Sequence, residues 1–164
     1  MKRILVAGMG NVLRGDDGFG IRVVERLMAM NLPPGVEVYE AGGAGIALAQ
    51  KLMDGFDACI IVDAALRGFA PGTLSCIEPE ICAQPRSIGL HEQDPSKVLA
   101  LAAALGALPA RVLLVGCEPL EVDELLADLS SPVAAAVEPA VHRILLELKQ
   151  LASGVPPQPL PASQ

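Results

Sequence analysis

The sequence predicts an α/β fold with three layers, in which helices cover both faces of a mostly parallel, twisted five-stranded sheet that contains one antiparallel strand. Apolar residues make up 52% of the chain and aromatic residues only 2%, so Ala, Leu, Val and Ile must build the core, and these residues suit helices and buried parallel strands. Short apolar runs alternate with segments of helical periodicity. The strand-like runs at residues 59–62 and 73–77 are too close in the sequence for a crossover helix between them, so the second is expected to be antiparallel to the first.

The predicted elements follow in the order strand, helix, strand, helix, strand, strand, helix, strand, helix. Apolar or alternating runs predict the strands, and apolar residues at helical spacing predict the helices. Pro71 and Gly72 mark the turn before the antiparallel strand, Asp94 is the expected N-cap before Pro95, and Pro139 is expected to bend the last helix. The expected ranges are 4–7, 36–40, 59–62, 73–77 and 111–116 for the strands, and 19–30, 45–53, 95–105 and 131–150 for the helices.

The length of 164 residues fits one α/β domain, which we place at residues 1–152. Residues 153–164 contain four prolines and little to bury, which predicts a disordered tail. No apolar stretch has the length of a signal-peptide core or a membrane span, so we expect a soluble, cytoplasmic protein without a membrane partner. We also expect a monomer.

Charge and cysteine content narrow the possible partners. The chain has 12 Lys and Arg against 19 Asp and Glu, and its formal charge of −7 would repel nucleic acid phosphates. Cys59, Cys76, Cys82 and Cys117 form no CxxC pair, so we expect buried, reduced thiols rather than a metal site.

The loop at residues 8–20 is rich in glycine and carries the adjacent acids Asp16 and Asp17 between a strand and a helix. Glycine loses much conformational freedom on folding and like charges repel, so this costly combination indicates a function. The two carboxylates could cap the following helix or bind a divalent cation, and both hypotheses hold if each residue takes one role. The loop does not identify the metal.

Dinucleotide binding is the main alternative for this loop. Gly8-x-Gly10 follows a strand, and Glu40 ends the next strand, where an acid would meet a ribose hydroxyl. However, Leu13 stands where the fingerprint needs its third glycine, and the acidic pair would repel a pyrophosphate. We therefore rank this alternative second, and expect Glu40 to be an exposed charge.

Two further candidates lie after later strands. Asp63 directly follows an apolar strand, where a carboxylate needs a partner such as a metal, a cation or a structural hydrogen bond, and we favour a ligand. His91 lies in a loop, and an imidazole with two carboxylates is a recurrent open site for a transition metal, although composition alone does not decide its role. His142 lies within the last amphipathic helix, where we expect a surface or core-edge position.

Several motifs occur in order along the chain, the first long and specific and the others short: Gly8-Met9-Gly10-Asn11-x-Leu13-x-x-Asp16-Asp17-Gly18-x-Gly20, Gly42-Gly43-Ala44-Gly45, Val62-Asp63-Ala64, Pro71-Gly72-Thr73, His91, Leu114-Val115-Gly116 and Glu138-Pro139-Ala140. In these motifs the chain resembles the hydrogenase maturation endopeptidases, the nickel-dependent proteases of nickel-iron hydrogenase large subunits. The resemblance covers nearly the whole chain except the tail. Ala44 stands where the family often has Thr, so a hydroxyl role is absent there.

The resemblance implies that Asp17, Asp63 and His91 form both the metal-binding and the catalytic set of an aspartyl-type endopeptidase. It implies a hydrolase that removes the C-terminal extension of a large-subunit precursor after nickel has been installed, and so activates another enzyme. The nickel would arrive with the precursor, which is the expected partner. The alternative is a nucleotide- or nickel-binding accessory module without proteolytic activity.

Overall fold

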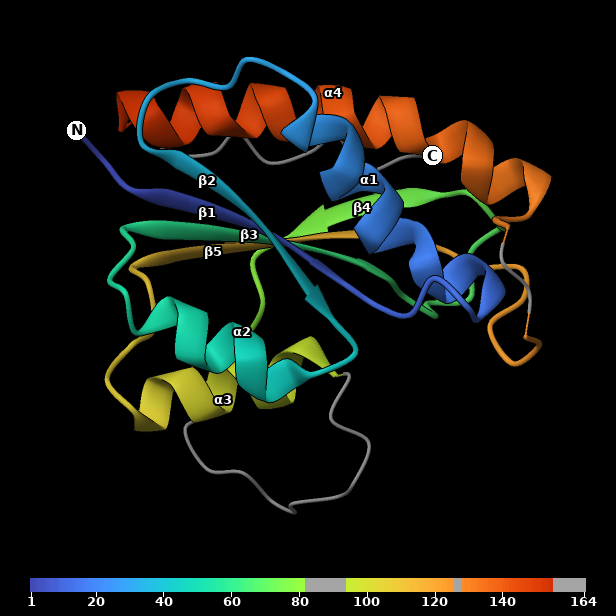
Figure 1. Ribbon diagram of the computed structural model, residues 1–164, viewed down its shortest axis with the longest axis horizontal. Coiled ribbons are helices and arrows are strands. Elements are labelled where there is room, and N and C mark those ends of the chain that lie inside the picture. The colour runs from blue at the N-terminus through green and yellow to red at the C-terminus, as the bar shows by residue number, and fades with distance from the viewer. Residues whose placement is uncertain (82–93, 126–127, 155–164) are drawn as a thin grey trace.

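The computed structural model describes residues 1–81, 94–125 and 128–154. Five strands form one twisted sheet in the order β2-β1-β3-β5-β4 (Figure 1). β1, β2, β3 and β5 pair in parallel, and β4 pairs with β5 in the antiparallel sense. The strand bounds are β1 (Ile4–Met9), β2 (Val36–Gly42), β3 (Ala58–Ala64), β4 (Leu74–Ile77) and β5 (Arg111–Cys117).

Helices lie on both sides of the sheet, α1 and α4 on one face and α2 and α3 on the other (Figure 1). The strand β1 shows why two layers form, because successive side chains of a strand point to opposite faces. Ile4 and Val6 belong to the core under α1 and α4, whereas Leu5 and Ala7 belong to the core under α2 and α3. The helix bounds are η1, a 3₁₀ helix (Gly15–Gly18), α1 (Phe19–Met28), α2 (Gly45–Leu52), α3 (Pro95–Ala104) and α4 (Ser131–Ser153).

The predicted fold class is confirmed, including the single antiparallel strand. Asp94 is the N-cap of α3 and accepts a hydrogen bond from the Ser96 amide, as predicted. The 3₁₀ helix η1 was not predicted. Helix α4 runs through Pro139 and ends at Ser153, beyond the predicted 150, and residues 155–164 of the predicted tail lie outside the described residues.

The described thiols differ in burial. Cys59 and Cys117 are buried as predicted, and burial is the main cause that raises the pKa of each to about 12. Cys76 is only half-buried, because β4 is an edge strand of the sheet, and Cys82 lies outside the described residues. Among the helices of the described residues, none combines the length and the apolar character that a membrane span requires.

Candidate functional site

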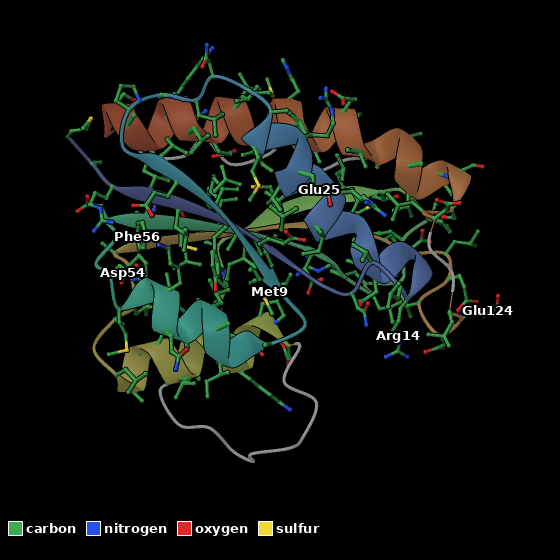
Figure 2. All side chains as sticks on the ribbon, in the orientation of Figure 1. Met9, Arg14, Glu25, Asp54, Phe56 and Glu124 are labelled. Atoms are coloured by element: carbon green, nitrogen blue, oxygen red, sulfur yellow. The ribbon has the colours of Figure 1, made fainter. Side chains whose placement is uncertain are left out.

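The parallel strands β1, β3 and β5 end at one edge of the sheet, which we call the carboxyl edge. Among the segments that leave the sheet there are residues 10–18, 65–73 and 118–125. Figure 2 labels Arg14 and Glu124 at this edge, and Asp54 and Phe56 at the opposite edge. In open α/β sheets ligands bind beyond the carboxyl ends of the strands, so this edge is the place to look for a site.

Asp63 is the sixth residue of β3 and pairs with Gly116 of β5 at the carboxyl edge. Its side chain is half-buried and lines a pocket of about 330 Å³ between β3, β5 and the start of α3. Asp94 is the second acid of this pocket. The lining residues are Ile61, Asp63, Ala64, Ala65, Asp94, Pro95, Ser96, Leu114, Val115 and Gly116.

Asp17 lies in η1 and reaches the same edge from the first loop. Its Oδ2 accepts a hydrogen bond of 2.9 Å from the Asn11 amide. Gly10 makes the close approach possible: its φ is +121°, and a Cβ at this position would overlap the carbonyl oxygen of Asp17. The same Cβ would lie 3.7 Å from Oδ1 of Asp63, so Gly10 separates the loop of one acid from the carboxylate of the other.

The surroundings of Asp63 and Asp17 raise the pKa of both acids. Burial raises the pKa of Asp63 well above its ordinary value, the nearby negative charges of Asp17 and Asp94 add to this, and the Ala64 amide opposes it. Burial also raises the pKa of Asp17, against the Asn11 amide and the positive charge of Arg14. Both acids therefore hold a proton more readily than a free Asp, and a cation between them would relieve the repulsion.

Asp16 has a different role from its neighbour. Its fully buried carboxylate accepts hydrogen bonds from the amides of Leu120, Glu121 and Ser130, at 2.8, 3.1 and 2.7 Å, and from the Ser130 hydroxyl at 2.7 Å. Burial raises the pKa of Asp16, but these hydrogen bonds outweigh it and the net pKa is lowered. Asp16 therefore ties the first loop to the loop before α4.

The hypothesis that one of the two acids caps the following helix is wrong. The N-cap of α1 is Gly18, and no side chain caps this helix. The short helix η1 intervenes, so both carboxylates precede α1 and find other partners.

Glu118 is a buried acid that the sequence analysis did not single out. Its carboxylate accepts hydrogen bonds of 2.8 Å from the Arg67 amide and 3.1 Å from the Gly68 amide, and it holds the loop between β3 and β4. Only the position of Glu118 directly after a strand could have drawn attention to it.

The other candidates are found in different settings. His91 lies outside the described residues. His142 is exposed on α4 as predicted, and so is Glu40 on β2. No cluster of three or more His, Cys, Asp and Glu that could hold a metal occurs within residues 1–81, 94–125 and 128–154.

The packing of the first loop argues against the dinucleotide alternative. A Cβ at Gly8 would overlap the carbonyl of Gly20 and the side chain of Val24, so Gly8 allows α1 to pack closely against β1. The space beside Gly10 is filled by the backbone of Asp17. Glycine serves here to pack the chain against itself rather than to admit a ligand.

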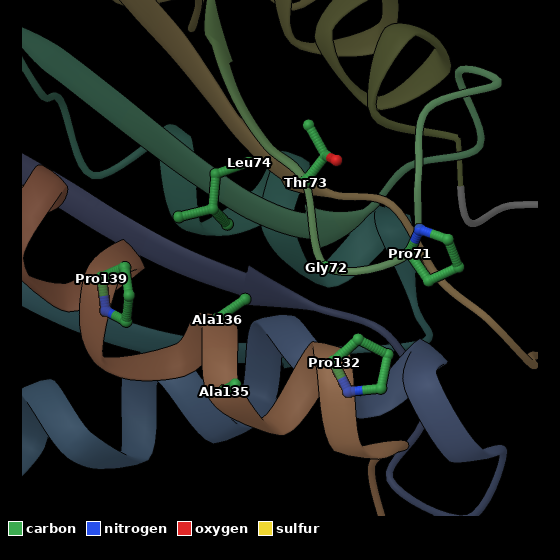
Figure 3. A pocket seen from close by; sticks show the side chains of 8 residues that line it. All are labelled: Pro71, Gly72, Thr73, Leu74, Pro132, Ala135, Ala136 and Pro139. Atoms are coloured by element: carbon green, nitrogen blue, oxygen red, sulfur yellow. The ribbon is translucent and has the colours of Figure 1, made fainter.

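A second hollow of about 330 Å³ lies between the start of β4 and α4 (Figure 3). None of its lining side chains is ionisable, so it offers no acid, base or metal ligand and is not a candidate for catalysis. The lining residues are Pro71, Gly72, Thr73, Leu74, Pro132, Ala135, Ala136 and Pro139.

Comparison with known proteins identifies the family to which the chain belongs. The family model of the hydrogenase maturation protease HycI matches residues 21–147. The chain belongs to the hydrogenase maturation protease family. This membership favours the protease over an accessory module without proteolytic activity.

Relatives of this maturation protease support the same conclusion. The chain is 41% identical over 150 residues to the hydrogenase expression/formation protein HoxM of Azotobacter vinelandii, which covers 88% of this chain and 70% of that protein. It is 37% identical over 155 residues to a putative hydrogenase maturation protease of Methanocaldococcus jannaschii, covering 91% and 98% of the two chains.

Solved structures extend the likeness of the maturation protease to three dimensions. The hydrogenase maturating endopeptidase HybD of E. coli superposes with a TM-score of 0.78 at 34% identity, over 90% of this chain and 93% of that one. The hydrogenase 2 maturation peptidase of a Thaumarchaeota archaeon superposes with a TM-score of 0.70 at 37% identity, over 90% and 98%.

Proposed function

We propose that this maturation protease removes the C-terminal extension of a hydrogenase large-subunit precursor that already carries nickel, and that Asp17, Asp63 and His91 bind this nickel. The observation that carries the proposal is the meeting of two acids at the carboxyl edge, Asp17 from the first loop and Asp63 from β3, close enough for the charge of Asp17 to raise the pKa of Asp63. His91 enters through the family resemblance alone.

The electrostatics of the two acids suit a metal that arrives with the substrate. Without a cation the repulsion between them is relieved by a proton, and a metal ion that binds must displace that proton. Two carboxylates and one imidazole leave coordination positions free for the ligands that the nickel already has in the precursor.

Binding of the nickel would also place the peptide bond. The scissile bond would be held beside the two acids, and the nickel could polarise its carbonyl group or an attacking water. An acid with a raised pKa could exchange a proton with that water or with the leaving amine. Hydrolysis then consumes one water and gives a carboxylate on the mature subunit and a free amine on the extension.

The direct test compares nickel-loaded with nickel-free precursor, with cleavage followed by the mass of the large subunit. We expect shortening of the nickel-loaded precursor only, and loss of this cleavage in Asp17→Asn, Asp63→Asn and His91→Ala. Glu40→Gln and His142→Ala are controls, because both side chains are exposed and neither belongs to the proposed set of metal ligands. Equal cleavage of the nickel-free precursor, or full activity of Asp63→Asn, would overturn the proposal.

We also infer a cytoplasmic monomer. The three described cysteines are free thiols, which suits a reducing compartment. Light scattering coupled to gel filtration measures the mass directly, and one chain has 17.0 kDa.

A further inference from the structure

Large apolar side chains are exposed together on the loops of the carboxyl edge. We call five of them the apolar rim. Their exposed fractions are 60% for Leu13, 77% for Leu66, 54% for Phe69, 61% for Leu120 and 84% for Leu125. Among the described residues, the four leucines are the most exposed large apolar side chains apart from Met1.

Exposed large apolar residues also occur elsewhere, and several of them lie at helix ends. Met28 ends α1, and Met53 and Leu105 are the C-caps of α2 and α3, with exposed fractions of 50%, 59% and 50%. Single exposed apolar residues are ordinary in soluble proteins, whereas several on neighbouring loops indicate an interaction surface.

The loops of the apolar rim are fixed by two buried carboxylates. Asp16, which is fully buried, joins the loop of Leu13 to the amides of Leu120 and Ser130. Glu118, with an exposed fraction of 5%, joins the loop of Leu66 and Phe69 to the end of β5.

Burial of a carboxylate is costly unless hydrogen bonds compensate for it, and these carboxylates have such bonds. The apolar side chains therefore lie on loops that are ordered before binding, and this preorganisation reduces the entropy that binding costs.

The rim is continuous with the acidic pair. Leu13 lies in the same loop as Asp17, and Leu66 follows Asp63 by three residues, in a loop held to β5 by the hydrogen bond from the Ala65 amide to the Cys117 carbonyl. A macromolecule that presents a bond to Asp17 and Asp63 must lie against these loops.

The charges around the rim favour a protein as the partner. Arg14 forms an ion pair of 3.8 Å with the exposed Asp123, so both signs of charge stand beside the apolar side chains. An apolar centre with a mixed polar border is typical of a protein interface. A membrane surface or a nucleic acid would need an excess of positive charge, whereas the chain carries −7.

We propose that the apolar rim is the docking surface for the folded body of the large-subunit precursor, apart from its extension and its nickel. The inference rests on the proposed function, since the precursor is taken as the substrate. The rim binds apolar surface next to the nickel site of the precursor, and the acidic pair then meets the metal.

The test replaces two rim leucines and leaves the acids unchanged. The double variant Leu66→Ser/Leu120→Ser is compared with the control Met53→Ser/Leu105→Ser, whose side chains are similarly exposed at the opposite edge. Steady-state cleavage of the nickel-loaded precursor gives KM and kcat, and biolayer interferometry gives the affinity for the same precursor.

The rim variant should raise KM and Kd about tenfold or more and leave kcat within about twofold, because a few anchoring side chains supply most of the affinity of an interface. The control should match wild type, and both variants should keep the melting temperature because the replaced side chains are exposed.

Equal KM and Kd in the rim variant, the control and wild type would overturn the docking surface while the proteolytic function stands. A wild-type dimer that the rim variant dissociates would also overturn it, because the rim would then bind a second copy of this chain. Rim-dependent binding of the precursor without cleavage by wild type would keep the docking surface and remove the proposed function.

Discussion

Asp16 and Asp17 are neighbours in the chain but place their carboxylates in different surroundings. Asp16 is buried and accepts hydrogen bonds from residues more than 100 positions away. Asp17 is half-buried and faces the charge of Asp63. One acid therefore holds the loops together, and the other is available to a ligand.

Replacement of Asp16 tests its structural role. Asp16→Asn turns one acceptor into a donor that faces the amide and hydroxyl donors, so we expect a loss of about 2–4 kcal/mol in the free energy of unfolding. Asp57→Asn is the control, because Asp57 is an exposed carboxylate that accepts one amide hydrogen bond, from Arg3, and its replacement should cost below about 1 kcal/mol. Urea unfolding measures both, and equal losses would contradict the assignment.

The raised pKa of Asp63 predicts a pH-dependent stability. The folded protein retains this proton above the pH at which the unfolded chain releases it, so Asp63 costs stability as the pH rises from about 4 through its folded pKa. Asp63→Asn should therefore raise the stability at pH 7.5 by about 1–2 kcal/mol, a typical gain when a strained functional group is replaced.

Thermal unfolding of Asp63→Asn and wild type from pH 4 to pH 8 measures this difference, which should shrink towards pH 4, where both folded and unfolded Asp63 bind the proton. A difference that stays constant would show that folding does not shift the pKa of Asp63, and one that grows as the pH falls would show that Asp63 is ionised and stabilising; either result would contradict the raised pKa.

At the scale of residues, the sequence predicts where a side chain lies in the fold better than it predicts its hydrogen-bond partners. The ends of strands located Asp17 and Asp63, because parallel strands must end at a common edge. The sequence could not assign the partners of Asp16, since Leu120 and Ser130 come beside it only after the whole sheet has formed. The structural role of Glu118 could not be predicted for the same reason.

At the scale of elements, the unit β1–η1–α1 depends on close backbone contact. Helix α1 starts next to the ends of β1 and β3, and Gly20 is the point of contact: a Cβ there would overlap the carbonyl oxygens of Val62 and Met9. The glycines of the first motif are thus needed for packing, and this packing brings Asp17 to the carboxyl edge.

Gly20→Ala should therefore lower the free energy of unfolding by about 3 kcal/mol or more, because backbone atoms cannot yield as a flexible side chain can. Gly106→Ala is the matched control. Gly106 has a φ of +69° with open space around its Cβ position, so alanine there should cost only about 1–2 kcal/mol of backbone strain. Similar losses in the two variants would contradict the close contact.

The elements predicted best are those with a strong local pattern. The apolar run in β3 and the Asp94-Pro95 start of α3 were placed correctly because their signals lie within a few residues. Helix η1 escaped prediction because glycine-rich loops show no periodicity. Helix α4 passes Pro139 without ending because its apolar residues pack against the sheet on both sides of the proline.

At the scale of the whole molecule, one sheet edge collects features from distant parts of the chain. The acids come from the first loop and from β3, and the apolar rim comes from three loops tied by Asp16 and Glu118. The fold class followed from the alternation of strands and helices. The apolar rim could not be predicted from the sequence, because exposed leucines have no sequence pattern of their own.

The central claim is that Asp17 and Asp63 bind the nickel of the precursor, and X-ray absorption at the nickel edge tests it most directly. The spectrum of the nickel-loaded precursor alone is compared with that of its complex with the protease, trapped by a precursor that cannot be cleaved. We predict additional oxygen or nitrogen ligands in the complex, and their loss in the double variant Asp17→Asn/Asp63→Asn. A nickel shell that does not change when the complex forms would contradict the account.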